Sequence, residues 1–335
     1  MGCCEKIYCV SGIGGYNVTK ISVLFKPSEH ISDGERTLKK QRWKNRYLSA
    51  QFFISLLWKV MRQVILIGLC FLIIYPLFVK FVTSFASESD LFDPTVKFFP
   101  RQPGLSMIRQ VANSLNYGKT LINTALLSLL VGLCQLVVSA LAAYGFARFK
   151  PRGSSILFAL TMMTLMVPQQ VILTPLFLQF KNFMGLNLLN TFWPFAIISL
   201  TGLGLKNGLY IYMLRQLFRG LPKELEESAF IDGAGTLRTF VSIVLPNAIP
   251  MMVTVFLFSF TWQWTENVYT PLFLPQTDVF SRLMPMVASV TRDGPERYSA
   301  LSNTAALLII IPILLLFLLL QRHFVESMER SGLVG

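Results

Sequence analysis

Long apolar stretches constrain the fold of this chain more than any other feature of its sequence. Several of them run for about 20 residues with almost no charge, which is the length that a helix needs to cross a hydrocarbon core about 30 Å thick. Hydrophobic residues make up 53% of the chain and charged residues only 14%, whereas soluble domains average about 25% charged residues. The composition therefore argues against a soluble enzyme and indicates an integral membrane protein.

Six apolar segments follow one another along the chain and predict an all-α, polytopic membrane protein with six transmembrane helices. Their approximate bounds are Val64 to Val82, Thr120 to Ala147, Ser154 to Phe180, Leu188 to Phe218, Phe240 to Trp264 and Ala300 to Leu320. Several segments contain Pro or Gly, which such helices tolerate where neighbouring helices or a water-filled cavity satisfy the freed backbone groups. A packed bundle around a pathway fits this pattern better than isolated anchors do.

The distribution of basic residues predicts the orientation of the chain. The net charge is +13, but no nucleic-acid-binding motif accompanies it. With the N-terminus inside, 20 of the 30 Lys and Arg residues fall in the predicted cytoplasmic segments. The positive-inside rule then favours both termini in the cytoplasm, with the chain crossing the membrane several times. The five cysteines form neither a disulfide framework nor a zinc motif.

The sequence divides into two tails and one membrane domain. We expect residues 1–62 to form a cytoplasmic N-terminal tail, residues 63–321 the six-helix transmembrane domain, and residues 322–335 a cytoplasmic C-terminal tail. Residues 42–62 mix basic and apolar side chains at roughly helical spacing. They predict either an amphipathic helix along the inner leaflet or an extension of the first transmembrane helix.

The loop at residues 221–246, between the fourth and fifth segments, is the most informative stretch. Pro222 suits the first turn of a helix, the glutamates that follow suit its positive dipole end, and Gly233 suits its C-terminal stop. A second short helix is expected from Thr236 to Pro246. A short exposed helix with small, acidic and aromatic residues suits docking into a groove of another protein, and a solvated loop helix is the alternative.

This loop resembles the cytoplasmic EAA motif of ATP-binding-cassette (ABC) importer permeases. The match runs from Glu227-Ser228-Ala229 through Gly233 to Ile243-Val244-Leu245-Pro246, with Ser228 in place of the usual alanine. Four short motifs are similar to the carbohydrate branch of this family, near the smaller permease subunit of maltose-type importers. They lie at residues 142–148 (AAYGFAR), 221–227 (LPKELEE), 231–234 (IDGA) and 321–325 (QRHFV). The resemblance covers residues 60 to 335.

The resemblance implies a type I ABC importer permease fold in the bacterial cell membrane, and a chain that is no enzyme and needs no cofactor. It also implies a second homologous permease subunit, two ATPase subunits, an extracellular solute-binding protein and a sugar substrate as partners. The nearest approach to a phosphate loop, residues 113–120, lacks its first glycine. The positions implied to couple to the ATPase are Glu227, Ser228, Ala229, Phe230, Asp232, Gly233 and Ala234.

Three polar residues are candidates for the translocation path. Lys206 falls in the fourth apolar segment, where an ionisable side chain either faces an aqueous pathway or bonds an internal carbonyl, unless the segment is drawn wrongly. The resemblance implies that Glu266 and Asn267 lie near the path, while the main sugar pocket belongs mostly to the partner permease. Trp262 and Trp264 match sugar stacking, but an interfacial aromatic belt is the preferred interpretation of both.

Three rival functions remain. A secondary transporter driven by an ion gradient needs membrane-embedded Asp or Glu, and the first four and the sixth segments contain none. A non-transporting scaffold does not need a docking helix together with broken segments. An ABC permease for a solute other than sugar differs less from the predicted function, because only the flanking sequence motifs argue for sugar.

Overall fold

The computed structural model describes residues 50–91, 93, 99–149, 152–204, 206–289 and 295–332. Within these ranges all regular structure is helical, and the only β pairing is an isolated bridge between Phe183 and Leu186. The all-α prediction is confirmed for this part of the chain. The helices are α2 (Ala50–Ser84), α3 (Glu88–Leu91), α4 (Ser106–Ser114), α5 (Tyr117–Tyr144), η1 (Gly145–Phe149), α6 (Ser154–Met163), η2 (Thr164–Met166), α7 (Gln169–Lys181), α8 (Trp193–Leu200), α9 (Asn207–Gly220), α10 (Glu224–Ile231), α11 (Thr236–Thr239), η3 (Phe240–Val244), α12 (Leu245–Asn247), α13 (Ile249–Trp264), α14 (Tyr269–Phe273), α15 (Phe280–Ser289) and α16 (Pro295–Gly332).

The chain divides into two compact units, residues 1–72 and residues 73–335. In the first unit the described residues form the beginning of α2, whose apolar side chains from Phe53 onward are exposed. From Ala50 the helix runs without interruption into the first apolar segment. This agrees with the helical-extension alternative for residues 50–62, whereas residues 42–49 and the rest of the N-terminal tail lie outside the described residues.

Four helical stretches are long and apolar enough to span a membrane: Phe53–Ser84, Tyr117–Phe149, Thr236–Trp264 and Arg297–Arg322. A fifth span is added if the pair Ser154–Met166 and Gln169–Lys181, bent by 94°, counts as one. The bend falls at Val167, which is extended because the ring of Pro168 disfavours the helical conformation of the residue before it.

The fourth predicted segment is two short helices rather than one. α8 ends at Leu200 and α9 begins at Asn207, and Gly202 between them has a φ of 78°. Each helix alone is shorter than the roughly 20 residues that a span requires. The helical content of the prediction is therefore confirmed, but its count of six continuous helices is not.

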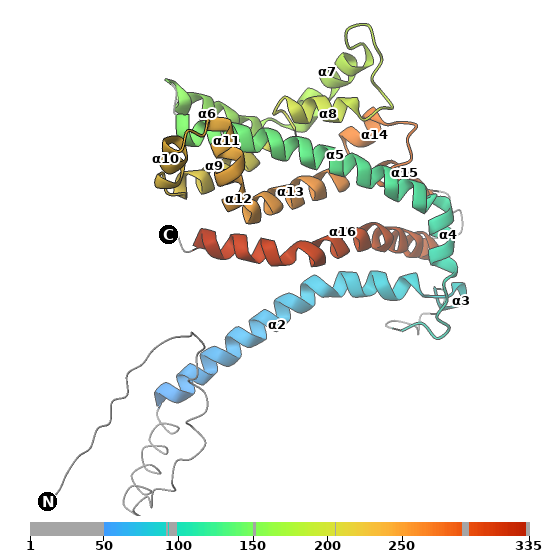
Figure 1. Ribbon diagram of the computed structural model, residues 1–335. Helices are drawn as coiled ribbons and strands as arrows, with labels where there is room; N and C mark the ends of the chain where they lie inside the picture. The colour runs from blue at the N-terminus through green and yellow to red at the C-terminus, as the bar shows by residue number, and fades with distance from the viewer. Residues whose placement is uncertain are drawn as a thin grey trace, which may run out of the picture. The chain divides into compact units, whose positions relative to one another are not determined.

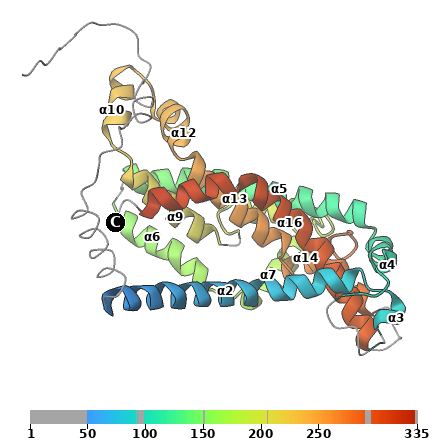
Figure 2. The ribbon, with the colours of Figure 1, turned by 90° about the horizontal axis from the view of Figure 1, so that it is seen from below.

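Helix α5 is the centre of the second unit and packs against α8, α9 and α13 (Figure 1). Aromatic side chains from α5, α9 and η3 meet in one core cluster, which includes Tyr144, Tyr210, Phe218 and Phe240. In both views α10 lies near the Tyr144 end of α5 and α4 lies at its other end (Figure 2). The long axis of α5 thus connects two different local structures.

Candidate functional site: an exposed helix and a cavity

Helix α10 forms where the sequence predicts a docking helix. It runs from Glu224 to Ile231, and its first turn carries Glu224, Glu226 and Glu227. Carboxylates in the first turn of a helix interact favourably with the unsatisfied N–H groups and positive dipole end there. This local electrostatic preference explains why the short segment is helical.

Gly233 ends α10 in the left-handed conformation, with a φ of 81°. The Ala234 N–H donates to the Ala229 carbonyl at 2.9 Å, and the Gly233 N–H donates to the Phe230 carbonyl at 3.1 Å. This pair of bonds is the Schellman arrangement, which satisfies the last carbonyls of a helix. No atom lies within 4 Å of an added Cβ at Gly233, so backbone conformation rather than space requires glycine there.

The outer face of α10 combines charged and apolar groups. Glu227, Ser228 and Asp232 are exposed, and Phe230 and Ile231 are 45% and 86% exposed. Of the other predicted coupling positions, Gly233 is exposed, Ala234 is half-buried and Ala229 is buried. An exposed isoleucine beside an exposed phenylalanine is the kind of surface that marks a protein contact.

Glu226 lies on the opposite face and anchors α10 to the bundle. Its Oε1 lies 2.6 Å from Arg148 Nε, and its Oε2 accepts a hydrogen bond from the Tyr144 hydroxyl at 3.1 Å. Arg148 also donates to the carbonyl of Leu221, just before α10. Sequence reasoning missed this ion pair, because only the packing of α10 in the folded chain decides which of its carboxylates faces Tyr144 and Arg148.

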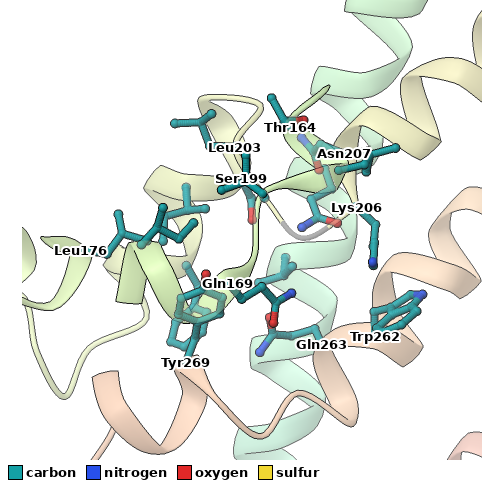
Figure 3. A pocket seen from close by; sticks show the side chains of 18 of the residues that line it. Thr164, Gln169, Leu176, Ser199, Leu203, Lys206, Asn207, Trp262, Gln263 and Tyr269 are labelled. Carbon is teal, nitrogen blue, oxygen red and sulfur yellow. The ribbon is translucent and has the colours of Figure 1, made fainter. Parts of the chain in front are cut away.

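A cavity of about 670 Å³ lies between α5, the α6–α7 bend, α8, α9, α13 and α14 (Figure 3). Most of its wall is apolar, with polar side chains set among the apolar ones. This volume is within the range of about 300–1,000 Å³ of ligand sites. Its lining contains the amides of Gln135, Gln169, Gln170, Asn207 and Gln263, the hydroxyls of Thr164, Ser199 and Tyr269, the ammonium of Lys206, and the ring of Trp262. The described lining contains no Asp or Glu.

Lys206 is the candidate path residue that the structure places in this cavity. It lies between α8 and α9 with a φ of 63°, a conformation that residues other than glycine rarely adopt. Its ammonium lies over the Trp262 ring, 5.1 Å from the centroid (Figure 3). Among the described residues no carboxylate forms an ion pair with it.

The two other candidates do not line the cavity. Glu266 is buried, and its carboxylate accepts hydrogen bonds from the backbone N–H groups of Val268, Tyr269 and Thr270 and from the Thr270 hydroxyl. These four donors satisfy the carboxylate at the N-terminal end of α14. Asn267 is exposed and also lies outside the lining.

The belt interpretation is wrong for Trp264. That side chain is only 3% exposed, packs in the core cluster of α4, α13 and α16, and donates to the Ile309 carbonyl. Two residues earlier on α13, Trp262 is 47% exposed and lines the cavity. Residues two positions apart on a helix point to different sides of it, so the two Trp rings have different surroundings.

Residues 135–330, more than half of the chain, match the family described as the binding-protein-dependent transport system inner membrane component. The chain belongs to this family. It is therefore a permease subunit of an ABC importer and an inner membrane component, which is consistent with a transport subunit rather than an enzyme.

Curated relatives agree with this membership. The chain is 30% identical to a probable ABC transporter permease of Pyrococcus horikoshii, over 68% of this chain and 80% of that protein. It is 28% identical to the sn-glycerol-3-phosphate transport system permease protein UgpE of Yersinia pestis, over 78% and 92% of the two chains. For the alpha-glucoside transport system permease protein AglG of Rhizobium meliloti the identity is 30%, over 68% and 59%.

A solved structure shares the fold. A chain of a bacterial ABC transporter involved in the import of the acidic polysaccharide alginate superposes with a TM-score of 0.67, at 19% identity and over 82% of this chain and 98% of that one. The architecture is therefore the fold of an ABC importer permease, as the EAA-like loop suggests.

Proposed function

We propose that this permease forms half of the translocation path for a carbohydrate and couples it to separate ATPase subunits through α10. The observation that carries the coupling is the exposed face of Glu227, Ser228, Phe230 and Ile231 on a helix closed by a left-handed glycine. Relatives named for alpha-glucoside and sn-glycerol-3-phosphate transport support a carbohydrate or a related polyol as the solute.

The rest of the assembly follows from the family. A second homologous permease completes the path, two ATPase subunits supply the energy, and an extracellular binding protein delivers the solute. Residues 63–321 form a domain of six spans, in which α8 and α9 together make the fourth, and residues 1–62 and 322–335 lie in the cytoplasm. Glu227 pairs with a basic residue of the ATPase, and α10 transmits closure of the ATPase dimer to the membrane helices.

Two substitutions on α10 test the coupling. Glu227→Lys reverses the charge offered to the ATPase, and Gly233→Asp penalises the left-handed stop by about 1 kcal/mol or more. Both variants should reach normal abundance in the membrane but retain little ATPase on purification and take up little sugar. The coupling role is wrong if both variants bind the ATPase and transport like the wild type.

Two control variants keep this test specific. Ser228→Ala restores the usual small residue of the motif and should bind the ATPase normally. Gly185→Asp creates the same backbone strain away from α10, because Gly185 has a φ of 86° and open space around it. It should also retain the ATPase.

The ion-driven alternative is tested by purification from the native membrane. Co-purification of an ATPase and a second permease supports the importer. Transport by this chain alone in liposomes, without ATP and with an ion gradient, contradicts it.

A further inference from the structure

Lys206 gives the cavity an unbalanced positive charge. The only group that the described structure places against its ammonium is the Trp262 ring, which attracts a cation weakly compared with a carboxylate. No acidic side chain lines the cavity in the described residues. Lys206 is half-buried, and an ionisable side chain at a cavity within the membrane normally pairs with an opposite charge or a carbonyl, so a bound anion would complete this site.

Asn207, the next residue, is a second and independent sign of a ligand. Its side chain is 1% exposed and lines the same cavity (Figure 3). Neither its amide nitrogen nor its amide oxygen has a hydrogen-bond partner in the described structure. Buried amides are almost always paired, and this one can both donate and accept.

Gly204 makes room for these polar groups. A Cβ added at this glycine would overlap the side-chain amide of Gln135 and lie 3.0 Å from Asn207 Oδ1. The missing side chain therefore leaves room for both amides, from α5 and α9, beside the backbone at Gly204. Together with Gln169 and Gln170 on α7 they offer the mixed donors and acceptors that hydroxyl groups need.

We propose that the cavity binds an anionic carbohydrate. Its carboxylate or phosphate group pairs with Lys206, its hydroxyls bond Asn207 and the glutamines, and an apolar face of its ring packs on Trp262. This proposal rests on the proposed carbohydrate transport and specifies the substrate class. A neutral sugar would leave Lys206 without a counter-charge and is expected to bind more weakly.

The test uses the complete importer, purified with its partner permease and ATPase but without the binding protein. Equilibrium dialysis compares glucose, glucuronate, glucose 6-phosphate and inorganic phosphate as probes. At least one anionic sugar should bind about tenfold more tightly than glucose, and the better of the two tells whether carboxylate or phosphate is preferred. Equal binding of glucose and both anionic sugars overturns the proposal, and so does inorganic phosphate binding as tightly as either.

Variants at position 206 assign the effect to the ammonium. Lys206→Met should abolish the preference for the anionic sugar, whereas Lys206→Arg should keep it. Lys181→Met, at an exposed lysine of α7 outside the lining, removes the same charge and should also keep it. A preference that survives Lys206→Met overturns the proposal.

Uptake by the importer in liposomes, with its binding protein added, separates this proposal from the proposed function. Uptake of a neutral sugar alone, unchanged in Lys206→Met, overturns the anionic substrate and leaves carbohydrate transport intact. Uptake of another class of solute, with no sugar carried, overturns both.

Discussion

Two neighbouring carboxylates of α10 have different environments. Glu226 is 7% exposed and ion-paired with Arg148, whereas Glu227 is exposed. Successive residues of a helix are separated by about 100° around its axis, so one faces the bundle while the other faces outward. The proposed coupling therefore uses one residue to contact the ATPase and another to hold the helix on the membrane domain.

Breaking the Arg148–Glu226 ion pair by a single substitution should lower the stability of the permease. Both side chains are about nine-tenths buried, so Glu226→Gln or Arg148→Met alone leaves a buried charge unpaired and should cost about 3 kcal/mol. We expect a lower thermal unfolding midpoint of the solubilised permease for either variant.

The double variant and an exposed neighbour are the controls for this pair. Arg148→Met with Glu226→Gln leaves neither charge unpaired and should lose less stability than the sum of the single losses. Glu224→Gln, on an exposed side chain of the same turn, should change little. Additive losses at Arg148 and Glu226 would show that the two side chains do not interact.

Near the other end of α5, Asp278 should make the stability of the permease depend on pH. A hydrogen bond from Lys119, at 3.1 Å, and a second from Arg282 lower the pKa of this carboxyl group. A lowered folded-state pKa means that the ionised form stabilises the fold above the unfolded pKa of about 3.9. That contribution is lost as the pH falls through the folded-state value.

The measurement is the unfolding midpoint of the solubilised permease between about pH 6 and pH 3. The wild type should lose more stability over this range than Asp278→Asn, which cannot titrate. Lys119→Met should lie between them, because Arg282 remains. Parallel curves for the wild type and Asp278→Asn would show that this carboxylate does not contribute to the acid sensitivity.

At the scale of elements, α9 packs closely against α6 at Gly208, where there is no room for a side chain. A Cβ at Gly208 would lie 2.7 Å from the Thr161 carbonyl oxygen and 3.1 Å from Leu165 Cγ. Gly208→Ala should therefore push the two helices apart and cost about 1–3 kcal/mol. A lower unfolding midpoint of the solubilised permease would report this loss.

Gly220, at the end of the same helix, provides the matched control. No atom lies within 4 Å of an added Cβ there, so Gly220→Ala should gain up to about 1 kcal/mol from helix propensity. If Gly208→Ala is as stable as Gly220→Ala, the two helices are not packed as closely as the structure has them.

Sequence periodicity and turn chemistry predicted which segments are helical better than they predicted whether each helix is continuous. The start and stop of α10 follow from Pro222, the glutamates and Gly233, all of which act within one or two turns. The sharp bend before Pro168 and the gap from Thr201 to Lys206 interrupt stretches that are mostly apolar. Hydropathy cannot tell a continuous span from two short helices, because both bury the same residues.

At the scale of the whole molecule, the sequence predicted the candidate functional residues only where they lie together in one short segment. The predicted coupling residues lie within eight positions of one another, from Glu227 to Ala234. The cavity instead takes side chains from five stretches between Val131 and Phe273. Lys206 was found because a charge in an apolar segment is conspicuous, whereas Asn207 and Gln135 carry no such signal.

The membrane orientation is the last prediction, and single cysteines test it. In a background with all native cysteines replaced by serine, cysteine is introduced at Ser11, Ser89, Ser228 or Ser331. The excess of Lys and Arg in the predicted cytoplasmic segments places the first span's outer end near Ser89. A membrane-impermeant maleimide should therefore label only position 89 in intact cells.

Permeabilised cells that lack the ATPase subunits provide the control, because Ser228 as well as Ser89 is exposed in this subunit and both should then react. Labelling of position 228 in intact cells would reverse the proposed orientation and remove α10 from the ATPase side. An odd number of crossings would place Ser11 and Ser331 on opposite faces, so that one of them is labelled before permeabilisation. Protection of both until the membrane is opened is the result expected of six spans, with the break between α8 and α9 inside the fourth.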